Sequence, residues 1–310
     1  HLKGLTPFYK SEHRMLSKSG DWVWVRVQAK IVEYGEQGEP LRMAGTHRDI
    51  TAQKMAEQAI EMARRQEIEI GWEIQRSLLL GKPPSQMDGI QLGALAVPAR
   101  EICGDFYDFI RYSDQILDLI IGDVMGKGIV SALLGAATKS QLLRSCTILG
   151  QQLSPGQIPL PSRILDLLLK RIANDLISLE TFITLCYCRF DLIQQQALLV
   201  DCGHTRTIHY QKSVDACCFI SGENCPLGFV TQDAFKEITV PFREEDVFLF
   251  YSDGVTECQN RHGELFGEQR LADLVHVYHN HSPQQLLETI SSHLREFCGE
   301  VAFSDDFTCV

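Results

Sequence analysis

Four acidic stretches are the parts of this chain best suited to do chemistry. Each lies where an apolar run meets a turn: CGDFYD (103–108), GD (122–123), YSDG (251–254) and SDDF (304–307). Carboxylates gathered at strand ends repel one another and take up protons unless a cation compensates their charge. Such hard oxygen ligands suit Mg²⁺ or Mn²⁺ better than zinc. The pattern predicts a divalent-metal site assembled from distant segments.

The glycine-rich stretch IGDVMGKGIV (121–130) raises a competing possibility, a nucleotide phosphate site. A P-loop needs G-x-x-x-x-G-K followed by Ser or Thr. Here Gly126 and Lys127 precede Gly128, and Ile121 stands where the first glycine is required. A nucleotide-dependent kinase is therefore set aside. A cysteine-based phosphatase is also excluded, because no testable cysteine has the arginine that C-x₅-R demands six positions on.

Composition and charge set broader limits. With 45% hydrophobic residues among 310, the chain can bury a sizeable core. Residues 1–80 hold 12 basic and 11 acidic side chains, whereas the rest holds 17 basic and 29 acidic. This acidic second part argues against nucleic-acid binding, which favours basic patches. No apolar run reaches the roughly 20 residues of a membrane span, so we expect no membrane insertion.

The eleven cysteines form no C-x₂-C pair, so a zinc site of ordinary spacing is not expected. We interpret most of them as small buried hydrophobic residues in a reducing cytoplasm. No signal peptide is visible, which also favours a cytoplasmic location. Because the chain begins with His1, we expect it to be a piece of a longer protein.

Residues 1–50 predict an antiparallel β fragment. DWVWVRVQAKI (21–31) alternates apolar and polar positions, GEQGEP (35–40) is typical of a hairpin turn, and residues 41–48 return as a strand. Together with the KSG turn and the closing Asp49-Ile50-Thr51, this segment resembles the C-terminal half of a PAS sensor domain. A generic hairpin is the alternative.

Residues 51–82 predict a long helical linker, with Asp49 or Thr51 as its N-cap and a break at GKPPS (81–85). One thin apolar stripe runs along it: Met55, Ala59, Met62, Gln66, Ile70, Ile74 and Leu78. We expect this helix to pair with its twin in a homodimer. Packing on its own domain is the alternative.

Residues 83–310 predict a third region of mixed α and β structure. Short strands in hairpin order are interrupted by helix pairs near 130–148 and 162–178, and near 267–278 and 283–297. This order favours antiparallel sheets flanked by helices, an α+β class, over a doubly wound parallel sheet.

The ordered set PAREICGDFYDF, IGDVMGKGIVSALL, DCGHTRTIHY, NCPLGF, FLFYSDGVTE and SDDFTCV resembles the SpoIIE-like (RsbU-like) branch of the PPM metal-dependent serine/threonine phosphatases. The resemblance covers about residues 75–310 and includes EIQRSLL (73–79). It implies an αββα sandwich with two Mn²⁺ or Mg²⁺ ions at one edge between the sheets.

The same resemblance implies a set of catalytic metal ligands: Asp123 with the backbone carbonyl of Val124, Asp253 and Asp305. The first motif offers Asp105 and Asp108, of which we favour Asp105. Gly254 is expected to allow the tight turn that carries the SDG aspartate.

This sequence departs from the family pattern at two places. Cys103 replaces the first glycine of the usual GGD motif, and Lys127 stands where histidine is frequent. Lys127 and Arg100 are candidate ligands of a substrate phosphate, or else surface side chains. His204 is either a packing histidine or a general acid.

The resemblance implies hydrolysis of phosphoserine or phosphothreonine, with a phosphorylated STAS-type anti-anti-sigma regulator as the partner. A PAS fragment that leads through a helix into a phosphatase suggests control by an N-terminal sensor. The alternative is a catalytically silent signalling scaffold that keeps the fold and binds a regulatory partner.

Overall fold

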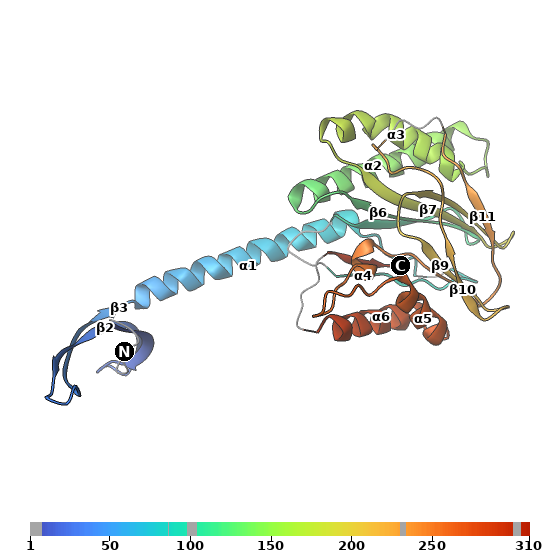
Figure 1. Ribbon diagram of the computed structural model, residues 1–310. Coiled ribbons are helices and arrows are strands. Elements are labelled where there is room, and N and C mark those ends of the chain that lie inside the picture. Colours follow the sequence, from blue (N-terminus) through green and yellow to red (C-terminus); the bar gives the residue numbers. More distant parts are fainter. Residues whose placement is uncertain (1–7, 86, 98–103, 230–233, 300–304) are drawn as a thin grey trace. The chain divides into compact units, whose positions relative to one another are not determined.

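The computed structural model describes residues 8–85, 87–97, 104–229, 234–299 and 305–310 (Figure 1). The chain divides into two units, residues 1–70 and 71–310, so the boundary falls inside the long helix α1 (Thr51–Leu79). Within the described ranges, no helix combines the length and the apolar character needed to cross a membrane.

The first unit contains an antiparallel sheet of order β1-β2-β3: β1 (Tyr9–Leu16), β2 (Trp22–Tyr34) and β3 (Pro40–Asp49). Strand β2 buries alternate residues, Val25, Val27, Ala29 and Ile31, because successive side chains of a strand point to opposite faces. The carboxylate of Asp49 accepts the backbone N–H of Thr51 at 2.8 Å, where α1 begins. The predicted hairpin and the start of the helix are thus confirmed.

The first sheet of the second unit has five antiparallel strands in the order β11-β8-β7-β6-β5. Its strands are β5 (Phe106–Arg111), β6 (Ile116–Val124), β7 (Ile183–Asp191), β8 (Gln196–Cys202) and β11 (Ile238–Pro241). Helices α2 (Ile129–Gln152) and α3 (Pro161–Ser178) cover its outer face (Figure 1). The contact is apolar and includes Ile120, Leu142, Leu165 and Leu185.

The second sheet combines β9 (Thr207–Gln211), β10 (Ala216–Ile220) and β12 (Val247–Leu249) with the pair β4 (Leu95–Val97) and β13 (Phe307–Cys309). Two backbone hydrogen bonds between Phe250 and Val310 join the two parts. Helices α5 (Glu268–Tyr278) and α6 (Pro283–Cys298) cover the outer face of this sheet (Figure 1).

A third apolar cluster, which includes Ile121, Cys186, Phe190, Leu199 and Phe250, fills the space between the two sheets. The order of layers is therefore helix, sheet, sheet, helix. The predicted αββα sandwich is confirmed. Strand β10 was not predicted, because ACCFI (216–220) follows a turn closely and offers little alternation.

Seven of the ten described cysteines are buried, as predicted, and Cys186, Cys188, Cys202 and Cys309 lie in strands. One pair differs: Cys258 and Cys298 form a disulfide that joins the segment after α4 (Asp253–Thr256) to the end of α6. The 40 residues that separate these cysteines in sequence gave no spacing signal for the pairing.

Candidate metal centre

The four acidic motifs lie at the ends of elements from both sheets. Asp105 immediately precedes β5, and Asp123 is the penultimate residue of β6. On the other sheet, Asp253 is the first residue of the short helix α4, and Asp305 lies two residues before β13. Antiparallel pairing sets Phe106 opposite Gly122, so the first two motifs lie at the same end of the first sheet.

The turn before β5 lies directly against the end of β6. A Cβ atom added to Gly104 would be 3.2 Å from Oδ1 of Asp123 and 3.1 Å from the carbonyl oxygen of Val124. The N–H of Gly104 also donates to Oδ2 of Asp306 at 3.2 Å, across 202 residues of sequence. The first motif therefore contacts both the second motif and the last.

The SDG motif is held against the last motif in the same way. A Cβ atom on Gly254 would be 2.1 Å from the carbonyl oxygen of Asp306. The hydroxyl of Ser252 donates to that oxygen at 3.0 Å and accepts the N–H of Thr308 at 3.1 Å. Gly254 is thus required for close approach of two backbones. The expected turn is present, because the N–H of Val255 donates to the carbonyl oxygen of Ser252 at 3.1 Å, but it does not need a positive φ at Gly254.

The pKa values of the aspartates reflect both their burial and their proximity to one another. Burial, followed by repulsion from Asp253 and Asp305, raises the pKa of Asp123 to about 7. Burial and the charge of Asp123 raise the pKa of Asp105 well above its usual range. Burial and Asp305 likewise raise the pKa of Asp253. Each shift reflects a negative group held close to others of the same sign.

The donor set fits two hard divalent cations. It offers four carboxylates and the carbonyl of the buried Val124, all of them oxygen ligands, whose accumulated negative charge a pair of Mg²⁺ or Mn²⁺ ions would offset. In the part of the chain that the structure describes, no three acidic, histidine or cysteine side chains are already arranged around a metal position. Ligation therefore requires side-chain rearrangement within the cluster.

Asp108, the other candidate of the first motif, contacts a different partner. Its Oδ2 lies 3.2 Å from Nζ of Lys139, a buried lysine of α2. Lys139 also donates to the carbonyl oxygens of Leu79 at 3.2 Å and Tyr107 at 3.4 Å. This arrangement favours Asp105 over Asp108 as the ligand and gives Asp108 a role beside the end of α1.

The structure describes two of the three remaining candidate residues of the site. Lys127 forms an ion pair with Asp305, and Arg100 lies outside the described residues. His204 is half-buried, and the partial removal of its ring from solvent lowers its pKa to about 4; its Nδ1 lies 3.0 Å from the hydroxyl of Thr184. A neutral, enclosed imidazole favours the packing interpretation over a general acid.

Sequence reasoning missed three supporting residues, Ser252, Asp306 and Thr308. Ser252 and Asp306 stand beside the aspartates in the YSDG and SDDF motifs, and a signal was available: polar residues at the ends of buried strands need hydrogen-bond partners. All three are buried, and together they tie the second sheet's two motifs to each other.

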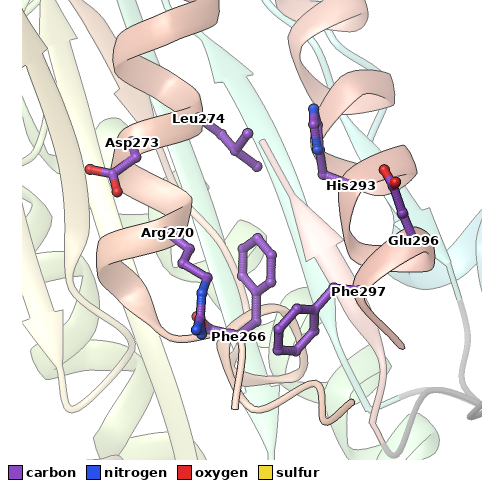
Figure 2. Close-up of a pocket in the computed structure, with 7 residues that line it drawn as sticks. All are labelled: Phe266, Arg270, Asp273, Leu274, His293, Glu296 and Phe297. Carbon is purple, nitrogen blue, oxygen red and sulfur yellow. The ribbon is translucent and has the colours of Figure 1, made fainter. Parts of the chain in front are cut away.

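A hollow between α5 and α6 is separate from this centre (Figure 2). It is lined by Phe266, Arg270, Asp273, Leu274, His293, Glu296 and Phe297. The guanidinium of Arg270 lies 5.2 Å from the ring centre of Phe297 and donates to the carbonyl oxygens of Leu265 and Phe266. None of the lining residues belongs to the four acidic motifs.

Comparison with known proteins agrees with this geometry. The family model for Stage II sporulation protein E (SpoIIE) matches residues 113–310, and a PAS fold model matches residues 1–47. The chain is 28% identical over 251 residues to phosphoserine phosphatase RsbU of Bacillus subtilis. This alignment covers 81% of this chain and 71% of that protein. It is 25% identical to phosphoserine phosphatase RsbP of the same organism, over 64% of this chain and 47% of the relative.

Two solved structures share the fold. The SiaA-PP2C domain of Pseudomonas aeruginosa aligns with a TM-score of 0.68 at 20% identity, covering 81% of this chain and 97% of that one. The PP2C phosphatase domain of SpoIIE from Bacillus subtilis, with a fragment of its regulatory domain, aligns with a TM-score of 0.57 at 18% identity, covering 70% and 60%.

Proposed function

Because this chain belongs to the SpoIIE family, we propose that it is a divalent-metal-dependent phosphatase whose four aspartates, Asp105, Asp123, Asp253 and Asp305, hold two Mn²⁺ or Mg²⁺ ions. Its homology to phosphoserine phosphatases makes it a serine/threonine protein phosphatase. The proposal concerns the metal ions, the substrate and the control of that activity. The observation that carries it is the meeting of the four acidic motifs at one end of the sandwich.

In the proposed reaction, a pair of bound cations supplies a water of lowered pKa and offsets the charge of the phosphoryl oxygens. The chain's own residues position the ligands. Asp123 interacts with the aspartates of all three other motifs. Asp105 belongs to its own sheet, and Asp253 and Asp305 belong to the motifs of the second sheet. The backbone contact of Gly104 holds the first motif against Asp123, and that of Gly254 holds the SDG motif against the last acidic motif.

The proposed substrate is phosphoserine or phosphothreonine in a STAS-type regulator protein. The support is the likeness to RsbU and to the RsbU and RsbW domains of a Mycobacterium tuberculosis protein, which aligns with a TM-score of 0.57 at 20% identity. The negative charge of the second part of the chain is compatible with a protein substrate and gives no basis for a nucleic-acid one. Lys127 and Arg100 stay candidates for contact with the phosphate.

Control by the PAS fragment through α1 is the third part of the proposal. Leu79, at the end of α1, is almost fully buried. A Cβ atom on Gly135 would be 3.2 Å from Cδ2 of Leu79 and 3.3 Å from the carbonyl oxygen of Gly104. Gly135 of α2 therefore lies close to both the end of α1 and the turn that carries Asp105. We expect a change in α1 to reach the carboxylates by this route.

The test is phosphate release from p-nitrophenyl phosphate and from a phosphorylated STAS protein, each with and without Mn²⁺. The proposal expects turnover of both substrates only with the metal. The scaffold alternative expects binding of the regulator and no turnover under either condition, and that result would overturn the proposed activity.

A further inference from the structure

Lys127 lies in the turn that joins β6 to α2. It is flanked by Gly126 and Gly128, whose φ angles are 101° and 92°. A Cβ atom on either glycine would meet nothing within 4 Å, so these glycines serve the backbone conformation and are not needed for space. The left-handed conformation at both positions shapes a turn from which the lysine side chain reaches the acidic cluster.

The lysine is engaged with one carboxylate of the proposed centre. Its Nζ lies 2.6 Å from Oδ2 of Asp305. The other oxygen of that carboxylate, Oδ1, accepts the N–H of Asp306 at 2.9 Å. Both oxygens of Asp305 are thus already bonded within the chain. A divalent cation that binds Oδ2 of Asp305 would therefore share this oxygen with the ammonium of Lys127, and one that binds Oδ1 would share it with a backbone N–H.

Displacement of the lysine is the easier of the two. The Lys127 side chain is 50% exposed, so its ammonium can move into water, whereas the N–H of Asp306 is fixed in the backbone beside β13. An ammonium and a divalent cation also repel each other strongly when they share one oxygen atom. Two cations can therefore compete for Asp305: the ammonium of Lys127 and a divalent ion from solution.

We propose that Lys127 is an internal counter-cation of Asp305, and that loading of the centre with Mn²⁺ or Mg²⁺ exchanges its ammonium for the metal. The inference rests on the proposed function, because it takes Asp305 to be a metal ligand. The ion pair neutralises part of the acidic cluster in the metal-free chain and lowers the apparent affinity for the metal. Loading then releases an ammonium at the edge of the centre.

Calorimetric titration with Mn²⁺ tests the exchange. Lys127→Gln removes the competing charge, and we expect it to bind Mn²⁺ about threefold to tenfold more tightly than the unchanged chain. Lys127→Arg keeps the charge and the ion pair, so its affinity should match that of the unchanged chain. An affinity of Lys127→Gln equal to or weaker than that of the unchanged chain would overturn the inference.

A second measurement needs no substitution. An amine-acylating reagent, read out by peptide mass spectrometry, should modify Lys127 faster after Mn²⁺ is added, because its ammonium is released. Lys170, exposed on α3, serves as the internal control and should not change. Labelling of Lys127 that is unaltered or slower with Mn²⁺ would contradict the exchange.

Different results would contradict the proposed metal-dependent function and the counter-cation role of Lys127. If the unchanged chain binds no Mn²⁺ at all, the proposed metal-dependent function is wrong. If the chain binds Mn²⁺ and releases phosphate, but Lys127→Gln leaves the affinity unaltered, only the counter-cation role is wrong.

Discussion

Gly254 and Asp306 approach each other so closely that a single methyl group between them would be 2.1 Å from a backbone carbonyl oxygen. This contact joins the SDG motif to the last acidic motif. It involves two backbones, so a side chain at position 254 cannot be accommodated by a rotamer change.

We therefore expect Gly254→Ala to displace Asp253 or Asp305, to lower the free energy of unfolding by about 2 kcal/mol or more, and to remove most phosphatase activity. Thermal unfolding and phosphate release measure the two effects. Gly150→Ala, in α2, is the matched control because a Cβ there meets nothing within 4 Å, and it should be neutral or stabilising. Full activity in Gly254→Ala would show that the contact does not position the motifs.

The pH dependence of stability in the metal-free chain follows from Asp123. Its pKa is about 7 in the folded chain and near the ordinary 3.8 in the unfolded chain. The folded state thus holds the proton more tightly, and the stability that this provides is lost as the pH rises from about 4 to about 7. The melting temperature without metal should fall between pH 5 and pH 7.5.

Two controls isolate this effect. Asp123→Asn should flatten the pH profile, since an amide does not titrate, and saturating Mn²⁺ should reverse the loss at pH 7.5 by binding the ionised carboxylates. A metal-free profile with the same slope in the unchanged chain and in Asp123→Asn would contradict the electrostatic account of the cluster.

Lys139 is expected to anchor the end of α1. Replacing it by Met removes its contacts with Asp108 and with the carbonyl of Leu79, and leaves a largely buried carboxylate without this cation. The amide of Gly81, which donates to the carbonyl of Tyr107, should then exchange its hydrogen faster. Hydrogen exchange with mass spectrometry measures this change.

The double variant Lys139→Met with Asp108→Asn removes the unpaired charge and should recover part of the protection. Unaltered exchange around residues 79–81 in Lys139→Met would show that the lysine does not hold the helix. Altered exchange together with unaltered phosphatase activity would show that α1 is anchored there without controlling the centre.

The dimer prediction concerns the exposed apolar stripe of α1. Met55 and Met62 are 64% and 62% exposed in the single chain. We expect Met62→Glu to weaken self-association, because it places charge in the predicted helix pair. Sedimentation velocity measures it, with Gln53→Glu, on the opposite face of the same helix, as the control. Equal association of the two variants would argue that the stripe is not the interface.

The sequence was sufficient for antiparallel sheets flanked by helices, because apolar runs such as residues 183–191 and 3.6-residue periodicity in helices such as 161–178 are local properties. The order of the layers came from the family resemblance. It also identified the aspartates, since carboxylates at the ends of apolar runs are locally visible. The sequence favoured Asp105 over Asp108 without deciding between them, because the two carboxylates, three positions apart, differ mainly in what packs against them. Lys139 decides their surroundings, and it lies 31 positions after Asp108 in the chain.

Other features depend on contacts that no local pattern encodes. The crowding of Gly254 comes from the backbone of Asp306, 52 positions away, so the sequence predicted the turn but not the close approach. The pairing of Cys258 with Cys298 follows from the packing of α6 beside α4. The ion pair between Lys127 and Asp305 joins the turn after β6 to the segment before β13, whereas the sequence suggested only a phosphate contact or a surface position for the lysine.

The most direct test of the account is a Mn²⁺ titration of the unchanged chain and of Asp123→Asn, with phosphate release measured in the same samples. Asp123 interacts with all three other aspartates, so we expect two Mn²⁺ ions per unchanged chain, much weaker binding in Asp123→Asn, and loss of nearly all turnover while the fold is retained. Full activity of Asp123→Asn at saturating Mn²⁺ would contradict the claim that divalent cations are what these carboxylates hold.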